Sequence, residues 1–199
     1  MNSYLTIDKN AFAEFKDRGS RFIAYAYPVV SIDEFKVHLS GLKKEHPKAV
    51  HHCFAYRLGT DGNTFRVSDD GEPSGTAGRP ILGQIDSRSL TNLVVIVVRY
   101  FGGTLLGVPG LINAYKTTTA LALQMVPVVE KAIEITFSIS CSYPQLNDVM
   151  TILKQYNCSI IHQDMGLFCS ITAGLPMVVL PVVKEMLQEL NGIELTRLT

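Results

Sequence analysis

The sequence lacks an excess of charge of either sign, paired cysteines and any long apolar run, and each absence excludes a class of protein. Its 199 residues carry 18 Lys and Arg against 18 Asp and Glu. A protein that coats nucleic acid through bulk charge is therefore excluded, although a local basic patch is not. No stretch approaches the roughly 18 apolar residues of a membrane helix, and the start MNSYLTIDKN has no basic region followed by an apolar run. We expect a cytoplasmic protein with no membrane partner.

The four cysteines, Cys53, Cys141, Cys158 and Cys169, form no CxxC pair. A chain of this length needs no covalent staples, so we expect reduced thiols.

What is present is the composition of a globular protein, with 47% hydrophobic and 18% charged residues. The length suits two domains, since typical domains have about 100 to 150 residues. Residues 1–128 carry 14 Lys and Arg against 11 Asp and Glu, whereas residues 129–199 carry 4 against 7. The two halves therefore differ in the sign of their charge, by +3 against −3.

Helix and strand signals alternate in the first half of the chain. Ser31 and Glu34 form a capping box that predicts a helix ending near His46. The strands expected next are 50–58 and 64–68, joined by a turn at Asp61-Gly62, and the β-branched run 92–100, which is typical of a strand buried on both faces. A helical pattern follows from Leu111 and ends before Pro127.

After residue 128 the pattern changes and predicts a second domain, 129–199. The expected elements are a strand 133–141, a helix around residues 146–153, strands 159–164 and 167–173, a helix around residues 179–190 and a last strand 193–198. This βαββαβ order is the ferredoxin-like arrangement. The sequence thus predicts an α+β protein of two domains.

The stretch SDDGEPSGTAGRP, residues 68–80, contains the first group of candidate site residues. If a helix begins near Pro80, its free amides would face Gly75, Thr76 and Gly78, and Arg79 adds a donor fork suited to phosphate. An anion site and a plain helix entry explain these residues equally well.

A second glycine cluster follows the buried strand and repeats this combination. Arg99 and Tyr100 offer a cation and an aromatic ring, and Gly102 and Gly103 offer backbone amides. The two loops could face one cleft, although Tyr100 could also complete the core while the glycines turn the chain.

Acidic and imidazole groups offer weaker alternatives. Asp69, Asp70 and Glu72 could hold magnesium, but their spacing is not that of a calcium loop and a solvated turn explains them better. His51 and His52 could transfer protons. On a strand His51 shares a face with Cys53 while His52 points the other way, so three zinc ligands cannot converge from this segment, and Cys53 is expected to be buried and structural.

Four motifs together resemble the IMPACT/YigZ family over essentially the whole chain. They are HHCFAY from His51, SDDGEPSGTAGRPIL from Ser68, VVRYFGGTLLG from Val97 and GLINAY from Gly110, and Ser20-Arg21-Phe22 is similar to the early SRF element of the family. Pro109 departs from the pattern, because the family has a glycine there, and it removes one amide donor from the second loop.

The resemblance implies a fold and a link to translation. The first domain would resemble domain IV of elongation factor G, an α+β sandwich, and the ferredoxin-like domain would resemble its domain V. Eukaryotic IMPACT proteins look like translation regulators that act through a domain absent here, whereas bacterial two-domain members have no settled activity.

Two functions therefore compete at this stage. The first is a non-catalytic, translation-linked protein that contacts RNA or the ribosome through its Gly-rich loops and needs no cofactor. The second is an enzyme for a small phosphorylated or nucleotide-like substrate. In that case Arg79, Arg99 and the glycine amides would hold phosphate, Asp70 and Glu72 would position magnesium or act as acid and base, and His51 or His52 would move protons. A protein-interaction module is a third possibility.

Overall fold

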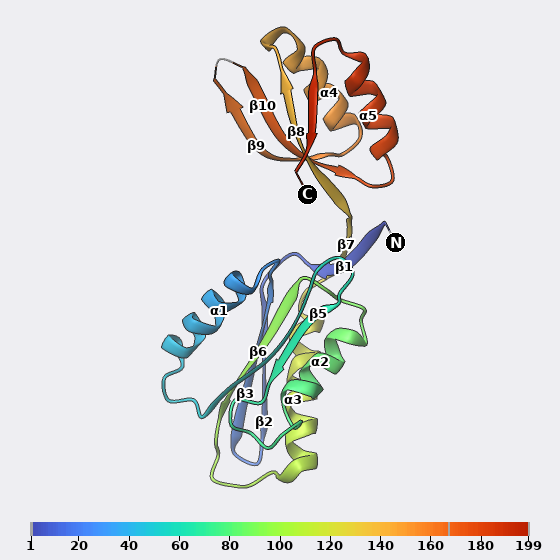
Figure 1. Ribbon diagram of the computed structural model, residues 1–199. Helices are drawn as coiled ribbons and strands as arrows, with labels where there is room; N and C mark the ends of the chain where they lie inside the picture. The colour runs from blue at the N-terminus through green and yellow to red at the C-terminus, as the bar shows by residue number, and fades with distance from the viewer. Residues whose placement is uncertain (1, 167, 199) are drawn as a thin grey trace. The chain divides into compact units, whose positions relative to one another are not determined.

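The computed structural model describes residues 2–166 and 168–198. Their contacts divide the chain into two compact units (Figure 1): one comprises Tyr4–Lys131, and the other comprises the residues from Ala132 onward with those before Tyr4. The two-domain α+β organisation expected from the sequence is thus confirmed. Across the described residues, no helix is long and apolar enough to cross a membrane.

The first unit is built on a five-stranded antiparallel sheet. In spatial order its strands are β2 (Ala11–Asp17), β3 (Ser20–Pro28), β6 (Leu93–Tyr100), β4 (His51–Leu58) and β5 (Thr64–Ser68). The β-branched run forms β6, which occupies the centre, and every residue of β6 except Tyr100 is buried. A strand with neighbours on both sides and helices over both faces offers few positions for polar side chains, which is why the run is apolar from Leu93 to Val98, with Arg99 as a buried charged residue after it.

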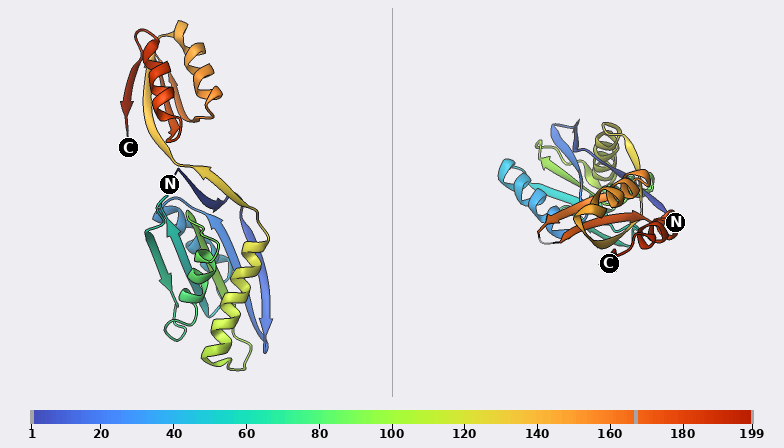
Figure 2. Two further views of the ribbon diagram at one scale, coloured as in Figure 1. Left: turned by 90° about the vertical axis from the view of Figure 1, so that its right-hand side faces the viewer. Right: turned by 90° about the horizontal axis from the view of Figure 1, so that it is seen from above.

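Helices cover both faces of this sheet (Figures 1 and 2). α1 (Ile32–Glu45) lies over one face, and α2 (Gly78–Asp86) and α3 (Gly107–Gln124) lie over the other. Each side has its own apolar core, with Phe35, Phe54 and Ile96 beneath α1 and a larger cluster beneath α2 and α3. The expected cap of α1 is present, since Ser31 Oγ accepts the Glu34 amide; the Glu34 carboxylate, however, accepts the amide of Val30 rather than that of Ser31.

α3 begins four residues before the apolar pattern suggested, at Gly107 rather than Leu111. Pro109 therefore lies in the first turn of a helix. The first amides of a helix have no partner within it, so proline is tolerated at this position. The N-terminal end of α3 therefore presents one hydrogen-bond donor fewer. Two strands that the sequence did not predict, β1 (Ser3–Ile7) and β7 (Val128–Ala132), form a separate two-stranded sheet.

The second unit confirms the βαββαβ order. Its elements are β8 (Glu134–Cys141), a 3-10 turn η1 (Tyr143–Gln145), α4 (Leu146–Gln155), β9 (Ser159–Met165), β10 (Cys169–Pro176), α5 (Leu180–Glu189) and β11 (Glu194–Arg197). The antiparallel sheet has the order β11-β8-β10-β9, with the apolar faces of α4 and α5 packed on it. Leu167, the expected first residue of the third strand, lies outside the described residues; β10 is described from Cys169.

Candidate functional site

His51 and His52 lie on opposite faces of strand β4, as the sequence predicted. Cys53 belongs to the core beneath α2 and α3, whereas Phe54 belongs to the core beneath α1. His51 therefore shares the side of Cys53, and His52 lies on the α1 side. Cys53 is fully buried, with Sγ 3.0 Å from the Asp69 carbonyl oxygen and 3.3 Å from Tyr115 Oη. Burial raises the pKa of this thiol well above its ordinary value. Cys53 is thus buried, as expected.

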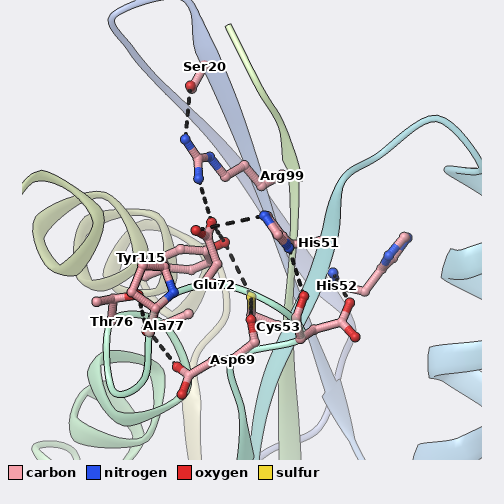
Figure 3. A network of polar contacts seen from close by, with 12 residues as sticks. Ser20, His51, His52, Cys53, Asp69, Glu72, Thr76, Ala77, Arg99 and Tyr115 are labelled. Carbon is pink, nitrogen blue, oxygen red and sulfur yellow. Dashed lines mark hydrogen bonds and ion pairs between the residues drawn. The ribbon is translucent and has the colours of Figure 1, made fainter. Parts of the chain in front are cut away.

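Glu72 is the centre of a buried polar network (Figure 3). Its Oε1 accepts hydrogen bonds from Arg99 Nη1 at 2.6 Å and from the Tyr115 hydroxyl at 2.7 Å. Glu72 and Arg99 are 8% and 5% exposed, so each charge is neutralised by the other inside the fold. Burial raises the pKa of Tyr115 far above its ordinary value, and the hydroxyl therefore remains a donor. The guanidinium of Arg99 lies 5.3 Å from the centre of the Phe22 ring.

His51 is held at the edge of this network. Its Nδ1 lies 2.7 Å from the carbonyl oxygen of Asp70, and since a carbonyl can only accept, Nδ1 carries a proton. In the neutral ring Nε2 is then an acceptor, and it lies 3.8 Å from Glu72 Oε2, beyond hydrogen-bond distance. The structure thus brings together His51, Glu72 and Arg99 from three different segments.

The loop before α2 does not offer the free amides that the sequence suggested. α2 begins at Gly78, and the amides of Gly75, Ala77 and Gly78 all donate to the Asp69 carboxylate at 2.9–3.0 Å. Burial acts to raise the pKa of Asp69, but these three bonds and Arg79 outweigh it, and the net shift is downward. The anion expected at this helix start is therefore the chain's own carboxylate. Arg79 itself is exposed beside it.

The other polar groups of this loop are also paired within the chain. Thr76 Oγ1 donates to the Pro73 carbonyl at 2.7 Å, and the Asp70 carboxylate accepts the His52 amide at 2.7 Å. Asp69, Asp70 and Glu72 thus bind three different partners instead of converging. In residues 2–166 and 168–198, no group of three His, Cys, Asp or Glu side chains is arranged to hold a metal ion. The magnesium alternative receives no support from this geometry.

The second glycine loop is explained by packing. A Cβ on Gly102 would lie 1.8 Å from the carbonyl carbon of Gly19, so only glycine permits the β2–β3 turn to approach this closely. The Gly102 amide donates to Ser20 Oγ at 3.2 Å, and Gly103 has a φ of +86°. Both observations fit the interpretation of these glycines as a turn.

A pocket of about 410 Å³ opens where β4, β6, the 70–73 loop and the start of α3 meet. Its polar groups are His51, Glu72 and Arg99. The remaining lining is mostly apolar and consists of Val50, Pro73, Phe101, Leu105, Leu106, Gly107, Val108 and Leu111. A concave, mostly apolar site with a few convergent polar groups is typical of small-molecule binding.

Tyr100 points away from this pocket, to the α1 side of the sheet. There its hydroxyl lies 2.9 Å from His46 Nδ1, and the His46 ring contacts that of Tyr25. Tyr25 is directly opposite Phe12 in the β2–β3 register and lies beside Tyr27 with nearly parallel rings. We call Phe12, Tyr25, Tyr27 and Tyr100 the aromatic face.

The aromatic face lies on strands that α1 leaves partly open. Phe12 is 67% exposed, and Tyr25, Tyr27 and Tyr100 are half-buried. Sequence reasoning found only Tyr100, since β2 and β3 were not predicted. The alternation of Tyr25 and Tyr27 with small residues is the signal that could have revealed the face.

Comparison with known proteins places the chain in a family. The model of the Impact N-terminal domain matches residues 18–123, and an IMPACT family member of Haemophilus influenzae is 36% identical over 82% of this chain and 80% of its own length. The chain belongs to the IMPACT family. The family member YigZ of Escherichia coli is 35% identical over 79% of this chain and 78% of its own length.

Solved structures agree with this family membership. The crystal structure of a hypothetical protein, 30% identical in sequence, aligns over 100% of this chain and 98% of its own with a TM-score of 0.77. The two-domain translational regulator Yih1 aligns over 57% of this chain and 45% of its own, with 28% identity and a TM-score of 0.38, which is too low to support an argument about this IMPACT family chain.

Proposed function

We propose that this IMPACT family member is a non-catalytic, translation-linked protein that binds single-stranded RNA, free or on the ribosome, through the aromatic face of its first unit. Exposed rings on a sheet are the usual platform for unpaired bases, because every base has a π-face that can stack on an aromatic side chain. The row of rings that begins at exposed Phe12 and continues through the half-buried tyrosines is the observation that carries the proposal. Membership of the IMPACT family, whose eukaryotic members look like translation regulators, supplies the biological setting.

Cations border the aromatic face and fit a nucleic-acid backbone. The Arg21 guanidinium lies 6.0 Å from the centre of the Tyr100 ring, held there by Glu14 at 2.6 Å, and Lys16 is exposed on the neighbouring strand. Lys43 and Lys44 lie in the last turn of α1, next to His46. The excess of positive charge in the first half of the chain supports the same location.

The Gly-rich loops are a weaker candidate for this contact than the sequence suggested. The amides of Gly75 and Gly78 already bind Asp69, and the Arg99 charge is neutralised by Glu72. Of the residues expected to contact RNA, Arg79, Gly102 and Gly103 are exposed and Tyr100 is half-buried, so these keep groups that a ligand could reach. The proposal therefore moves from the loops to the sheet.

The test is the binding of a labelled single-stranded RNA, its duplex and ribosomes to the full chain at two salt concentrations. We expect salt-sensitive binding that favours the single strand. Phe12→Ser should weaken it about tenfold, since stacking contributes about 1–3 kcal/mol per base. The matched control is Phe65→Ser, which removes a ring 55% exposed on edge strand β5. Absent binding, or equal losses in both variants, would overturn the proposal.

The pocket favours the second candidate, an enzyme for a small molecule, but it gives less support to a phosphorylated substrate or to magnesium. Arg99, Asp70 and Glu72, which were among the ligands expected for phosphate and magnesium, are committed to partners inside the chain, whereas Arg79 is exposed. A panel of metabolites tested by thermal shift, with and without magnesium, separates the candidates. A turnover product from any compound would establish the enzyme and end the non-catalytic proposal.

A further inference from the structure

We propose that the pocket between β4, β6 and the start of α3 binds a neutral nucleoside through the exocyclic amino group of its base. The proposal goes beyond RNA binding, because the pocket lies on the side of the sheet covered by α2 and α3, whereas the aromatic face lies on the α1 side. It rests on the donors and acceptors at the polar end of the pocket, on the charges that line it and on its size.

The polar end presents two acceptors side by side. The Asp70 carbonyl oxygen accepts a hydrogen bond from His51 Nδ1, so Nε2 is the acceptor in the neutral ring, and Glu72 Oε2 lies 3.8 Å from it. Glu72 Oε1 is occupied by Arg99 and Tyr115. A ligand that satisfies both acceptors must bring two hydrogens to one point. A base amino group carries two hydrogens on one nitrogen, whereas a hydroxyl carries one.

The charges around the pocket favour a neutral ligand. A carboxylate has no hydrogen to donate, and both a carboxylate and a phosphate would bring negative charge to the buried Glu72. An ammonium group has the hydrogens, but Arg99 and the positive N-terminal end of α3 at Gly107 line the same space. Because Arg99 already neutralises Glu72, no net negative charge remains for a cation to balance.

The walls fit a planar, apolar body. Phe101, Leu105 and Val108 are 47%, 81% and 51% exposed, so a wide apolar rim surrounds the opening, with Leu111 buried further inside. Small-molecule pockets typically measure roughly 300–1,000 Å³, and the 410 Å³ here suits a base with its sugar toward solvent. Burial of this rim by the flat ring would supply the hydrophobic part of the affinity.

The experiment uses matched nucleosides and the full chain. Adenosine is compared with purine riboside, and guanosine with inosine, because the members of each pair differ in one amino group alone. Binding is followed by amide chemical shifts in nuclear magnetic resonance titrations. We expect saturable shifts at residues 50–51, 72–73 and 99–111, with at least tenfold tighter binding of the amino-bearing member in one pair or both. Equal binding within both pairs, or no saturable shift, overturns the proposal.

Two variants locate the binding. His51→Phe keeps a ring but removes one acceptor, and it should abolish the preference within a pair. Val108→Trp fills the pocket from an exposed position and should abolish binding altogether; its matched control is Val37→Trp, 71% exposed on α1. Unchanged binding in folded Val108→Trp contradicts the site. The Phe12→Ser variant should bind nucleosides normally, so the two proposals can fail separately.

Discussion

At the scale of single residues, His52 is a buried imidazole whose Nε2 has no hydrogen-bond partner within residues 2–166 and 168–198. Burial lowers its pKa, against a smaller opposing effect of Asp70. Its folded pKa therefore lies below its unfolded pKa, and on acidification the unfolded chain takes up a proton first. The contribution of neutral His52 to the free energy of unfolding is fully present above the unfolded pKa. It is lost as the pH falls from the unfolded pKa through the folded pKa.

We therefore expect the thermal midpoint of the first unit to fall between about pH 7 and about pH 5, the range in which an unperturbed histidine titrates. His52→Leu should flatten this part of the profile, because it removes the group whose protonation differs between the two states. The control is His162→Gln, at an exposed position of β9, which should keep the natural slope. Identical slopes in all three proteins would contradict this assignment.

The candidate site was predictable only as far as local geometry determines it. The opposite directions of His51 and His52 follow from strand alternation alone, and so does the shared side of His51 and Cys53. The pairing of Asp69 with amides six to nine residues later depends on how the loop folds back, which no spacing rule supplies. Glu72 was assigned to metal or acid–base work, whereas Arg99 and Tyr115, distant in sequence, determine its role.

At the scale of elements, glycine is required where two turns come close together, but it is unfavourable in the interior of α1. Gly102→Ala should lower the stability of the first unit by about 3 kcal/mol, since the new methyl group would overlap the backbone of Gly19. Gly41→Ala should raise it by about 1 kcal/mol, because Gly41 lies inside α1 with nothing within 4 Å of the added Cβ. Urea unfolding measures both. Equal effects of the two substitutions would show that the contact at Gly19 can relax.

The elements that the sequence revealed are those with a clear period, and two of those it missed, β2 and β3, are disguised by alanine. β6 is an unbroken β-branched run, and α4 and α5 carry apolar stripes, so each was recognised. In β2 and β3 the positions facing α3 include Ala11, Ala13, Ala24 and Ala26, which pair across the two strands. Small side chains let α3 pack close to the sheet, but they are weak strand formers and hide the alternation.

At the scale of the whole molecule, each unit has an apolar core of its own. The first unit contains the clusters on either side of its sheet, and the second contains the cluster under α4 and α5. The domain boundary after residue 128 is still a prediction about folding, and hydrogen exchange can test it. In Gly102→Ala, amides of β3, β4 and β6 should exchange faster, while those of β8 and β10 should keep their natural rates, because separate cores open separately. Faster exchange in both units would show that they unfold together.

The Asp69 carboxylate gives the loop before α2 a built-in counter-ion. A tethered group is always present at the helix end, so a phosphate in solution must displace a competitor that cannot diffuse away. In relatives of this chain that differ only at this aspartate, the same amides would be free to bind an anion. A single carboxylate thus determines whether the amides before α2 are bound within the chain or are free to bind an anion from solution.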